Sequence, residues 1–405
     1  MNSLPDTPAV EPVRIPLSRP DISEVEVEEV LGVLRTPWLS MGPKVVEFEQ
    51  RFAAFLGVRH AVAVANGTCG LHLAIRAVGV RPGVEVITTP FTFVATANVV
   101  LFERATPVFV DIEPRTLNLA PEAVEAFIEK TYVPRAGQWI NRTSGAPLHA
   151  ILPVSVFGHP VEMDGFRSLV QSFNLRLVHD ACEAMGSVYW SASEGAWVSE
   201  AALAEAAVYA FYPNKQLTTG EGGMVVTQDD AIASYCRMAR NQGRQPGAHW
   251  LEHQALGFNY RLDELSAALG VAQMRRIQDL LARRDQVARW YDAALAEVDE
   301  VERPQAAPWA RVAWFVYVIR VRPGIDRDAL IGALARRGIA AKPYFPVVHL
   351  TPQCAALGYR HGDFPVAEDV ARRTVALPFF GGLTEEQVYE VVRCVKEVVV
   401  THARS

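Results

Sequence analysis

The alternation of apolar and polar positions is clearest between His60 and Thr227. Short runs rich in Val and Ile, bounded by Gly, Pro or Asp, alternate there with helical stretches. This pattern is typical of the buried strands of a mostly parallel sheet with crossover helices. The predicted strands are His60–Ala65, Glu85–Thr88, Pro107–Asp111, Ala150–Val156, Arg176–His179, Ala206–Phe211 and Gly223–Thr227.

Helical periodicity dominates the two flanking parts of the chain. It predicts helices over Ile22–Leu34, which Asp21 would cap, and over Lys44–Leu56. A long helical stretch, broken once, runs from Asp263 to about Val298. We expect a strand over Trp314–Val321 after it, and then helices over Arg327–Arg337 and Glu385–Val400. We therefore expect an N-terminal segment (1–45), a large α/β domain (46–274) and a smaller C-terminal α+β domain (275–405).

Two stretches interrupt this regular pattern. Residues 132–148 are polar and contain Gly and Pro, which predicts an irregular excursion before the Ala150 strand. Residues 190–200 form a second irregular stretch before the Ala206 strand. The sequence assigns no function to either stretch.

Composition and charge exclude several classes of protein. Half of the 405 residues are apolar and 21% are charged, as in a globular enzyme. The net charge of -6 leaves no basic excess for nucleic acid. The five cysteines are scattered and form no CxxC pair, and the start of the sequence has no basic cluster and no apolar run. No apolar run reaches membrane-spanning length. These features predict a cytoplasmic protein. We expect no metal site.

The carboxyl ends of the predicted strands carry the candidate chemistry, as is usual in parallel sheets. The first strand ends in Asn66-Gly67-Thr68-Cys69, and a helical pattern follows at once. Free backbone N–H groups at a helix N-terminus bind phosphate, and the Thr68 hydroxyl adds a donor. The alternative is a plain strand-to-helix turn that needs glycine.

Three further side chains follow other strands. Asp180 ends the Arg176 strand, and it either caps a helix or faces a cation. Lys215 lies in a loop with three glycines between two apolar strands; it is either solvated or functional. Phe93 either packs in the core or offers an apolar face to a ligand.

Together these groups fit one cofactor, pyridoxal 5′-phosphate (PLP). It needs an anion site for its phosphate, an amine for a Schiff base, a carboxylate for its pyridine nitrogen and a flat apolar face. A nicotinamide enzyme or a P-loop protein fits less well, because the glycine spacings that mark those folds are absent from the sequence.

Several segments resemble the DegT/DnrJ/EryC1/StrS family of sugar aminotransferases, within the fold-type I superfamily of PLP enzymes. They are PFTFVATANVV, VHDACEAMGS, FYPNKQLTTGEGGMVVT and LGFNYRLDELSAALGVAQM, and the resemblance covers nearly the whole chain. It implies a mostly parallel seven-stranded sheet flanked by helices, a smaller C-terminal domain and a homodimer with shared active sites.

The resemblance also implies roles for individual residues. Lys215 would form the internal aldimine, Asp180 would contact the pyridine nitrogen, and Phe93 would stack on the ring. Glu183 stands where the family often has Gln near the 3′ oxygen, and Asn259 would reach the phosphate across a dimer interface. The remaining candidates are phosphate contacts (Gly67, Thr68, Cys69) and substrate contacts (Trp38, Arg261, His349).

Two departures from the family pattern stand near these residues: Ala210 replaces a frequent Ser, and His179 replaces a frequent Glu. The resemblance implies transamination, with the cofactor alternating between PLP and its amine form PMP. We expect glutamate as the amino donor and a nucleotide-linked 3- or 4-keto-deoxysugar as the acceptor. The alternatives are a cyclitol or related ring ketone as the acceptor, or a non-catalytic regulator that binds PLP.

Overall fold

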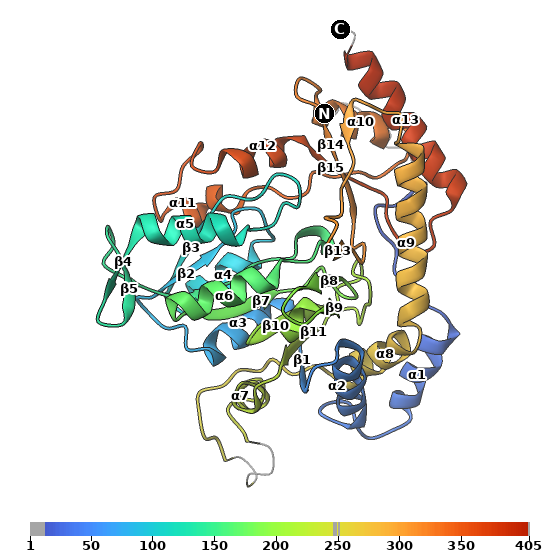
Figure 1. The fold of residues 1–405 in the computed structure, drawn as a ribbon. Coiled ribbons are helices and arrows are strands. Elements are labelled where there is room, and N and C mark those ends of the chain that lie inside the picture. Colours follow the sequence, from blue (N-terminus) through green and yellow to red (C-terminus); the bar gives the residue numbers. More distant parts are fainter. Residues whose placement is uncertain (1–12, 246–248, 250–251, 404–405) are drawn as a thin grey trace, which may run out of the picture.

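The structure is a computed structural model that describes residues 13–245, 249 and 252–403. The first 12 residues, on which the expected absence of a signal peptide rests, lie outside the described residues. A central sheet with helices on both faces forms the larger part, and a long helix leads away from it to the C-terminal part (Figure 1).

Seven strands form the main path of the central sheet. Their order is β1 (His60–Val64), β11 (Gly223–Thr227), β10 (Ala206–Ala210), β7 (Arg176–Asp180), β6 (Pro147–Ile151), β2 (Glu85–Thr88) and β3 (Thr106–Phe109). Only β11 runs antiparallel to its two neighbours in this path; the other pairs are parallel. The predicted mostly parallel α/β sheet is therefore confirmed.

Alternate residues of each strand face opposite layers of helices. In β1, Val62 and Val64 pack with α3 (Gly67–Ala77), α4 (Ala95–Phe102) and α7 (Asp230–Ala239). Ala61 and Ala63 pack on the other face with α2 (Pro43–Leu56) and α8 (Glu264–Arg275). Because both faces are covered, the strands read as continuous apolar runs.

Both stretches that we expected to be irregular contain β-hairpins, so that expectation was wrong. Residues 132–148 form β4 (Tyr132–Arg135) and β5 (Gln138–Asn141), and β5 pairs with β6 to extend the sheet to nine strands. The hairpin is held by the buried Glu85 carboxylate, which accepts hydrogen bonds from Tyr132 Oη (2.6 Å) and Asn141 Nδ2 (2.9 Å). Residues 188–198 form β8 (Val188–Ser191) and β9 (Ala196–Val198), which pair beside β13 (Ala310–Arg311).

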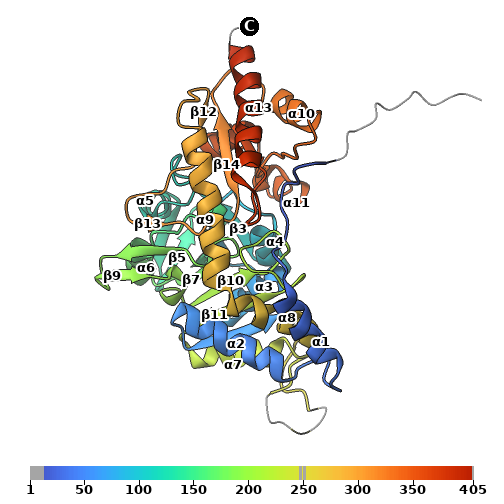
Figure 2. The same ribbon diagram turned by 90° about the vertical axis from the view of Figure 1, so that its right-hand side faces the viewer.

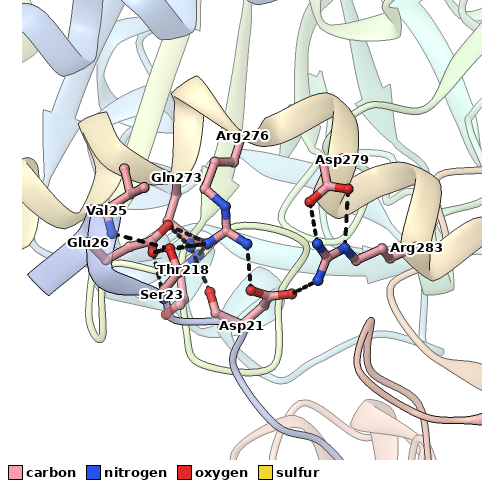
Figure 3. A network of polar contacts seen from close by, with 9 residues as sticks. All are labelled: Asp21, Ser23, Val25, Glu26, Thr218, Gln273, Arg276, Asp279 and Arg283. Carbon is pink, nitrogen blue, oxygen red and sulfur yellow. Dashed lines mark hydrogen bonds and ion pairs between the residues drawn. The ribbon is translucent and has the colours of Figure 1, made fainter.

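The first helix starts later than expected and has a different cap. Helix α1 spans Glu24–Leu34, and Ser23, not Asp21, caps it through a reciprocal pair of contacts with Glu26. Asp21 instead binds two arginines of the α8–α9 region, Arg276 (2.7 Å) and Arg283 (3.2 Å), as Figure 3 shows. The capping prediction failed because two distant cations compete for the Asp21 carboxylate.

The predicted break in the long C-terminal helical stretch is confirmed. It separates α8 from α9 (Ile277–Ala294) at Arg276, and α9 leads from α8 up to α13 (Glu385–Ala403), as Figure 2 shows. A second core joins α9 and α13 to β14 (Tyr317–Val321) and α10 (Arg327–Ala335). Ile15 belongs to this core, because its backbone pairs with residues 338–340.

The remaining elements complete the two parts of the chain. They are α5 (Pro121–Thr131), α6 (Met163–Phe173), β12 (Val301–Glu302), α11 (Pro352–Ala355), α12 (Pro365–Arg373), β15 (Thr374–Leu377) and three 3₁₀ turns at Val156–Gly158, Glu200–Ala202 and Val348–Leu350. None of the described helices has both the length and the apolar character that crossing a bilayer requires. The domain boundaries at 45 and 274 stay a prediction.

Candidate active site

A cavity of about 480 Å³ opens at the carboxyl ends of β7 and β10 and beside the N-terminus of α3. The fold explains this place, because strands that run in parallel end at one edge of the sheet. Six of the residues predicted from the sequence line the cavity: Gly67, Thr68, Phe93, Asp180, Glu183 and Lys215.

The N-terminus of α3 forms one end of the cavity. Asn66 caps the helix, and its Oδ1 accepts a hydrogen bond from the Cys69 N–H at 2.9 Å. A Cβ on Gly67 would lie 2.8 Å from the Ala210 Cβ, so glycine lets the helix start close to the end of β10. Backbone N–H groups at such a helix start attract anions. Cys69 instead packs against the core, where burial raises the pKa of its thiol to about 11.

Asp180 is buried and held by two donors. Its Oδ2 accepts a hydrogen bond from Thr96 Oγ1 at 2.8 Å, and its Oδ1 accepts one from the Cys182 N–H at 3.1 Å. Thr92 in turn bonds Thr96 at 2.9 Å. The carboxylate is therefore fixed at the cavity wall rather than capping a helix.

Lys215 is largely buried, with 13% of its side chain exposed, so the solvated alternative does not describe it. Its Nζ lies 3.3 Å from Glu183 Oε1 and 3.8 Å from the centre of the Phe315 ring. Burial raises the pKa of Glu183 above its usual value, although Lys215 and the Phe157 N–H, which donates to Oε2 at 2.9 Å, act in the opposite direction. The amine is thus held between a carboxyl group and an aromatic face.

The Phe93 side chain is 61% exposed, whereas Phe91, two residues earlier, is fully buried. The alternative in which Phe93 packs in the core is therefore wrong. Since it lines the cavity, its ring offers the flat apolar surface that an aromatic ligand needs.

Four predicted contacts lie elsewhere in the described chain. Asn259 is exposed, and Arg261 bonds Asn241 (3.0 Å) and Gln242 (2.9 Å). Trp38 is 60% exposed beside α1. His349 is buried and bonds Glu368 at 3.1 Å. The structure does not bring these four residues to the cavity of this chain.

Sequence reasoning missed several residues of the site. Tyr212, Asn214, Tyr344 and Phe345 line the cavity, and burial raises the pKa of Tyr344 above its usual value. Their segments lack strand or helix periodicity, so nothing in the pattern of the sequence places them there. Asn214 directly precedes Lys215, and this neighbouring position was the signal in the sequence that could have identified it as a site residue.

The cavity fits PLP on its own geometry. It combines a helix N-terminus, a fixed carboxylate, a buried amine and an exposed aromatic ring. Asn214 Oδ1 is also buried there without a hydrogen-bond partner among the described residues, which leaves an acceptor for a ligand.

Comparisons with known proteins agree with this assignment. Residues 20–396 match the DegT/DnrJ/EryC1/StrS aminotransferase family. The chain is 37% identical over 392 residues to GDP-perosamine synthase of Caulobacter vibrioides, covering 96% of this chain and 99% of that protein. It is 32% identical over 383 residues to the putative pyridoxal phosphate-dependent aminotransferase EpsN of Bacillus subtilis, covering 94% of both chains. The crystal structure of S. venezuelae DesV with a ketimine intermediate matches at a TM-score of 0.82 and 33% identity, covering 92% of this chain and 94% of that one.

Proposed function

Since the chain belongs to the DegT/DnrJ/EryC1/StrS family and is a PLP-dependent aminotransferase, we propose that it transfers an amino group from glutamate to a nucleotide-linked keto-deoxysugar. The observation that carries the proposal is the buried Lys215 amine, which shares one cavity with the Asp180 carboxylate and the start of α3. The name of the Caulobacter relative supports a GDP-linked sugar as the first acceptor to test.

The residues around the cavity would hold the cofactor from several sides. Gly67 and Thr68 at the start of α3 would bind its phosphate, Asp180 its ring nitrogen and Phe93 one face of its ring. Lys215 would hold it covalently. When bound, PLP accepts the electrons that a departing α-proton leaves behind and carries the amino group from donor to acceptor.

Two residues of the chain would perform the proton chemistry. The Lys215 amine takes a proton from the α-carbon of the donor and later delivers one to the sugar carbon. The Asp180 carboxylate holds a proton on the ring nitrogen, and its bonds to Thr96 and the Cys182 N–H keep it oriented for that task. Glu183 Oε1, 3.3 Å from the Lys215 amine, would help to orient that amine toward the cavity.

Replacing Lys215 with Ala tests the reaction. The purified enzyme with PLP is mixed with glutamate and a GDP-linked 4-keto-deoxysugar, and the amino sugar is measured by mass spectrometry. Because the residue proposed to move the α-proton is lost, we expect the rate to fall at least ~100-fold in K215A. Lys44, which forms partly buried ion pairs with Glu29 and Glu47 and does not line the cavity, provides the matched control, and K44A should keep the wild-type rate.

Three other outcomes would contradict parts of this proposal. A K215A enzyme with the wild-type rate would contradict the catalytic role of Lys215. A wild-type enzyme that aminates a cyclitol ketone but no nucleotide sugar would overturn the proposed acceptor. A chain that retains PLP and transfers no amine to any ketone would be a regulator.

A further inference from the structure

A buried arginine of α9, Arg284, contacts the loop that carries Lys215. Its guanidinium donates to the carbonyl oxygens of Trp314 (2.9 Å), Phe315 (2.6 Å) and Asn214 (3.2 Å). Within the part of the chain that the structure describes, no carboxylate lies at ion-pairing distance from it. Burial lowers the pKa of Arg284 to about 10.

Such an arrangement is unfavourable for the folded state by itself. A guanidinium taken out of water without an anion keeps a desolvation penalty that hydrogen bonds to neutral carbonyls offset only in part. The neighbouring Arg283 shows the ordinary alternative, since it lies nearer the surface and binds Asp21 and Asp279 (Figure 3). The Phe379 ring, whose centre lies 5.2 Å from the Arg284 guanidinium carbon, adds a cation–π contact but no counter-charge.

The three carbonyls connect two segments that both touch Lys215. Asn214 directly precedes Lys215, so its carbonyl belongs to the peptide bond that leads into the lysine. Phe315 supplies the ring 3.8 Å from Lys215 Nζ. One guanidinium thus fixes the backbone from which the lysine projects and the surface on which its amine rests.

A second side chain joins the same two segments. Gln216 Nε2 donates to the carbonyls of Glu183 (2.6 Å) and Ala313 (2.8 Å). Both neighbours of Lys215 are therefore connected to residues 313–315. Gln216 is connected by its own side chain, and Asn214 is connected through Arg284. Gln216 belongs to the Lys215 loop itself, whereas Arg284 lies on a different element, α9.

We propose that Arg284 is a positioning residue, which sets the place of the Lys215 amine by holding Asn214 and Phe315 together. The planar guanidinium directs donors to both segments at once, which the single ammonium of a lysine does with poorer geometry. Arg284 acts through Lys215 and does not line the cavity. The inference rests on the proposed role of Lys215 as the residue that holds the cofactor.

The capture of PLP by the cofactor-free protein tests this inference without relying on catalysis. PLP is added to the full chain, samples are reduced with borohydride at intervals, and the adduct on Lys215 is quantified by peptide mass spectrometry. We expect capture to be at least tenfold slower in R284M and intermediate in R284K. The control R283M, on the same helix, should capture PLP at the wild-type rate.

A double-mutant cycle separates positioning of Lys215 from a general defect. PLP retention is measured by equilibrium dialysis in the wild-type and K215A backgrounds. R284M should weaken retention in the wild-type background and have no further effect in K215A. In steady-state kinetics with glutamate, R284M should lower kcat with little change in KM.

Several results would overturn the inference. Capture of PLP by R284M at the wild-type rate would overturn it, and so would an equal weakening of PLP retention by R284M in the wild-type and K215A backgrounds. If R284M shows no cooperative thermal unfolding, R284K is judged by the same two measurements. A wild-type chain without an adduct on Lys215 would instead contradict the proposed function, so the two failures are distinguishable.

Discussion

Glu200 illustrates how one buried carboxyl group influences the pH dependence of this fold. Its Oε1 lies 2.8 Å from Ser155 Oγ, and its Oε2 accepts the Val161 N–H. Ser155 Oγ also lies 2.8 Å from His179 Nε2. Burial raises the pKa of Glu200 to about 8 and lowers the pKa of His179 to about 3, so both are uncharged at neutral pH although they are 3.7 Å apart.

Replacing Glu200 with Gln should remove one source of pH dependence. The folded state keeps a proton on Glu200 that the unfolded chain releases above its ordinary pKa. The free energy of unfolding should therefore fall as the pH rises toward 8, by up to ~1.4 kcal/mol per pH unit from this group. Gln cannot ionise, so urea unfolding of E200Q at several pH values should show a smaller slope.

The exposed Glu194 provides the control for this experiment. It lies in the turn between β8 and β9 and pairs with Arg167 at 3.2 Å. E194Q should keep the wild-type pH slope, because solvent screens its charge in both states. A slope in E200Q equal to that of the wild type would contradict the assignment.

The sequence predicted single residues well where the strand ends determine their place. Asp180, Thr68 and Lys215 follow strands of one sheet, and the structure brings them to one cavity. The Thr96 bond to Asp180 and the Phe315 ring beside Lys215 could not be predicted, because they depend on how distant segments pack. The exposure of Phe93 likewise follows from the tertiary structure rather than from its local pattern.

At the level of elements, the packing of α8 on α2 depends on a glycine in the middle of a helix. A Cβ on Gly270 would lie 2.8 Å from ring atoms of Phe48, which is fully buried. Glycine is normally a poor residue in a helix interior. Here it allows the two helices to approach each other.

Two glycine-to-alanine substitutions should therefore have opposite effects. G270A should destabilise the fold by ~1–2 kcal/mol, since overpacking outweighs the gain of up to ~1 kcal/mol in helix propensity. In α1, nothing lies within 4 Å of a Cβ on Gly32, so G32A should stabilise by ~0.5–1 kcal/mol. Thermal unfolding of both variants measures the difference, and shifts in the same direction would contradict the packing argument.

Elements with both faces buried were predicted correctly, whereas edge hairpins were missed. The strands β1 and β11 are apolar along most or all of their length, because helices cover both faces. The β4–β5 hairpin lies at the sheet margin, and residues such as Arg135 and Gln138 are exposed. Its strands therefore carry no continuous apolar run by which the sequence could identify them.

At the scale of the whole molecule, exposed apolar side chains offer a surface on which a second copy of the chain could pack. Exposed apolar residues gather on α1 and the turn that follows it: Leu31, Leu34, Trp38, Leu39 and Met41. Extended exposed apolar surfaces mark interaction sites. We propose a homodimer in which Asn259 and Arg261 of one chain complete the cavity of the other.

Subunit mixing tests this arrangement. K215A and N259D should each be inactive, but when coexpressed their heterodimers contain one site with both residues intact, so activity should return to roughly a quarter of the wild type. Coexpressed K215A and D180N provide the control. Both of these residues line the cavity of the same chain, so every site keeps a defect and activity should stay absent.

A monomeric mass in light scattering would contradict the homodimer. Absence of recovery in the K215A and N259D mixture would contradict the shared site even in a dimer. Recovery in the control mixture would show that the assay does not separate the subunits' contributions.

The pairing of Ile15 with residues 338–340 has a consequence for biosynthesis. The N–H groups of Arg14 and Ile15 donate to the Gly338 carbonyl, and the Ala340 N–H donates to the Ile15 carbonyl. A ribosome makes Ile15 near the start of translation and its partners only near the end. The smaller core therefore closes only on a nearly finished polypeptide, and a nascent chain stalled before Gly338 lacks the partner for its own beginning.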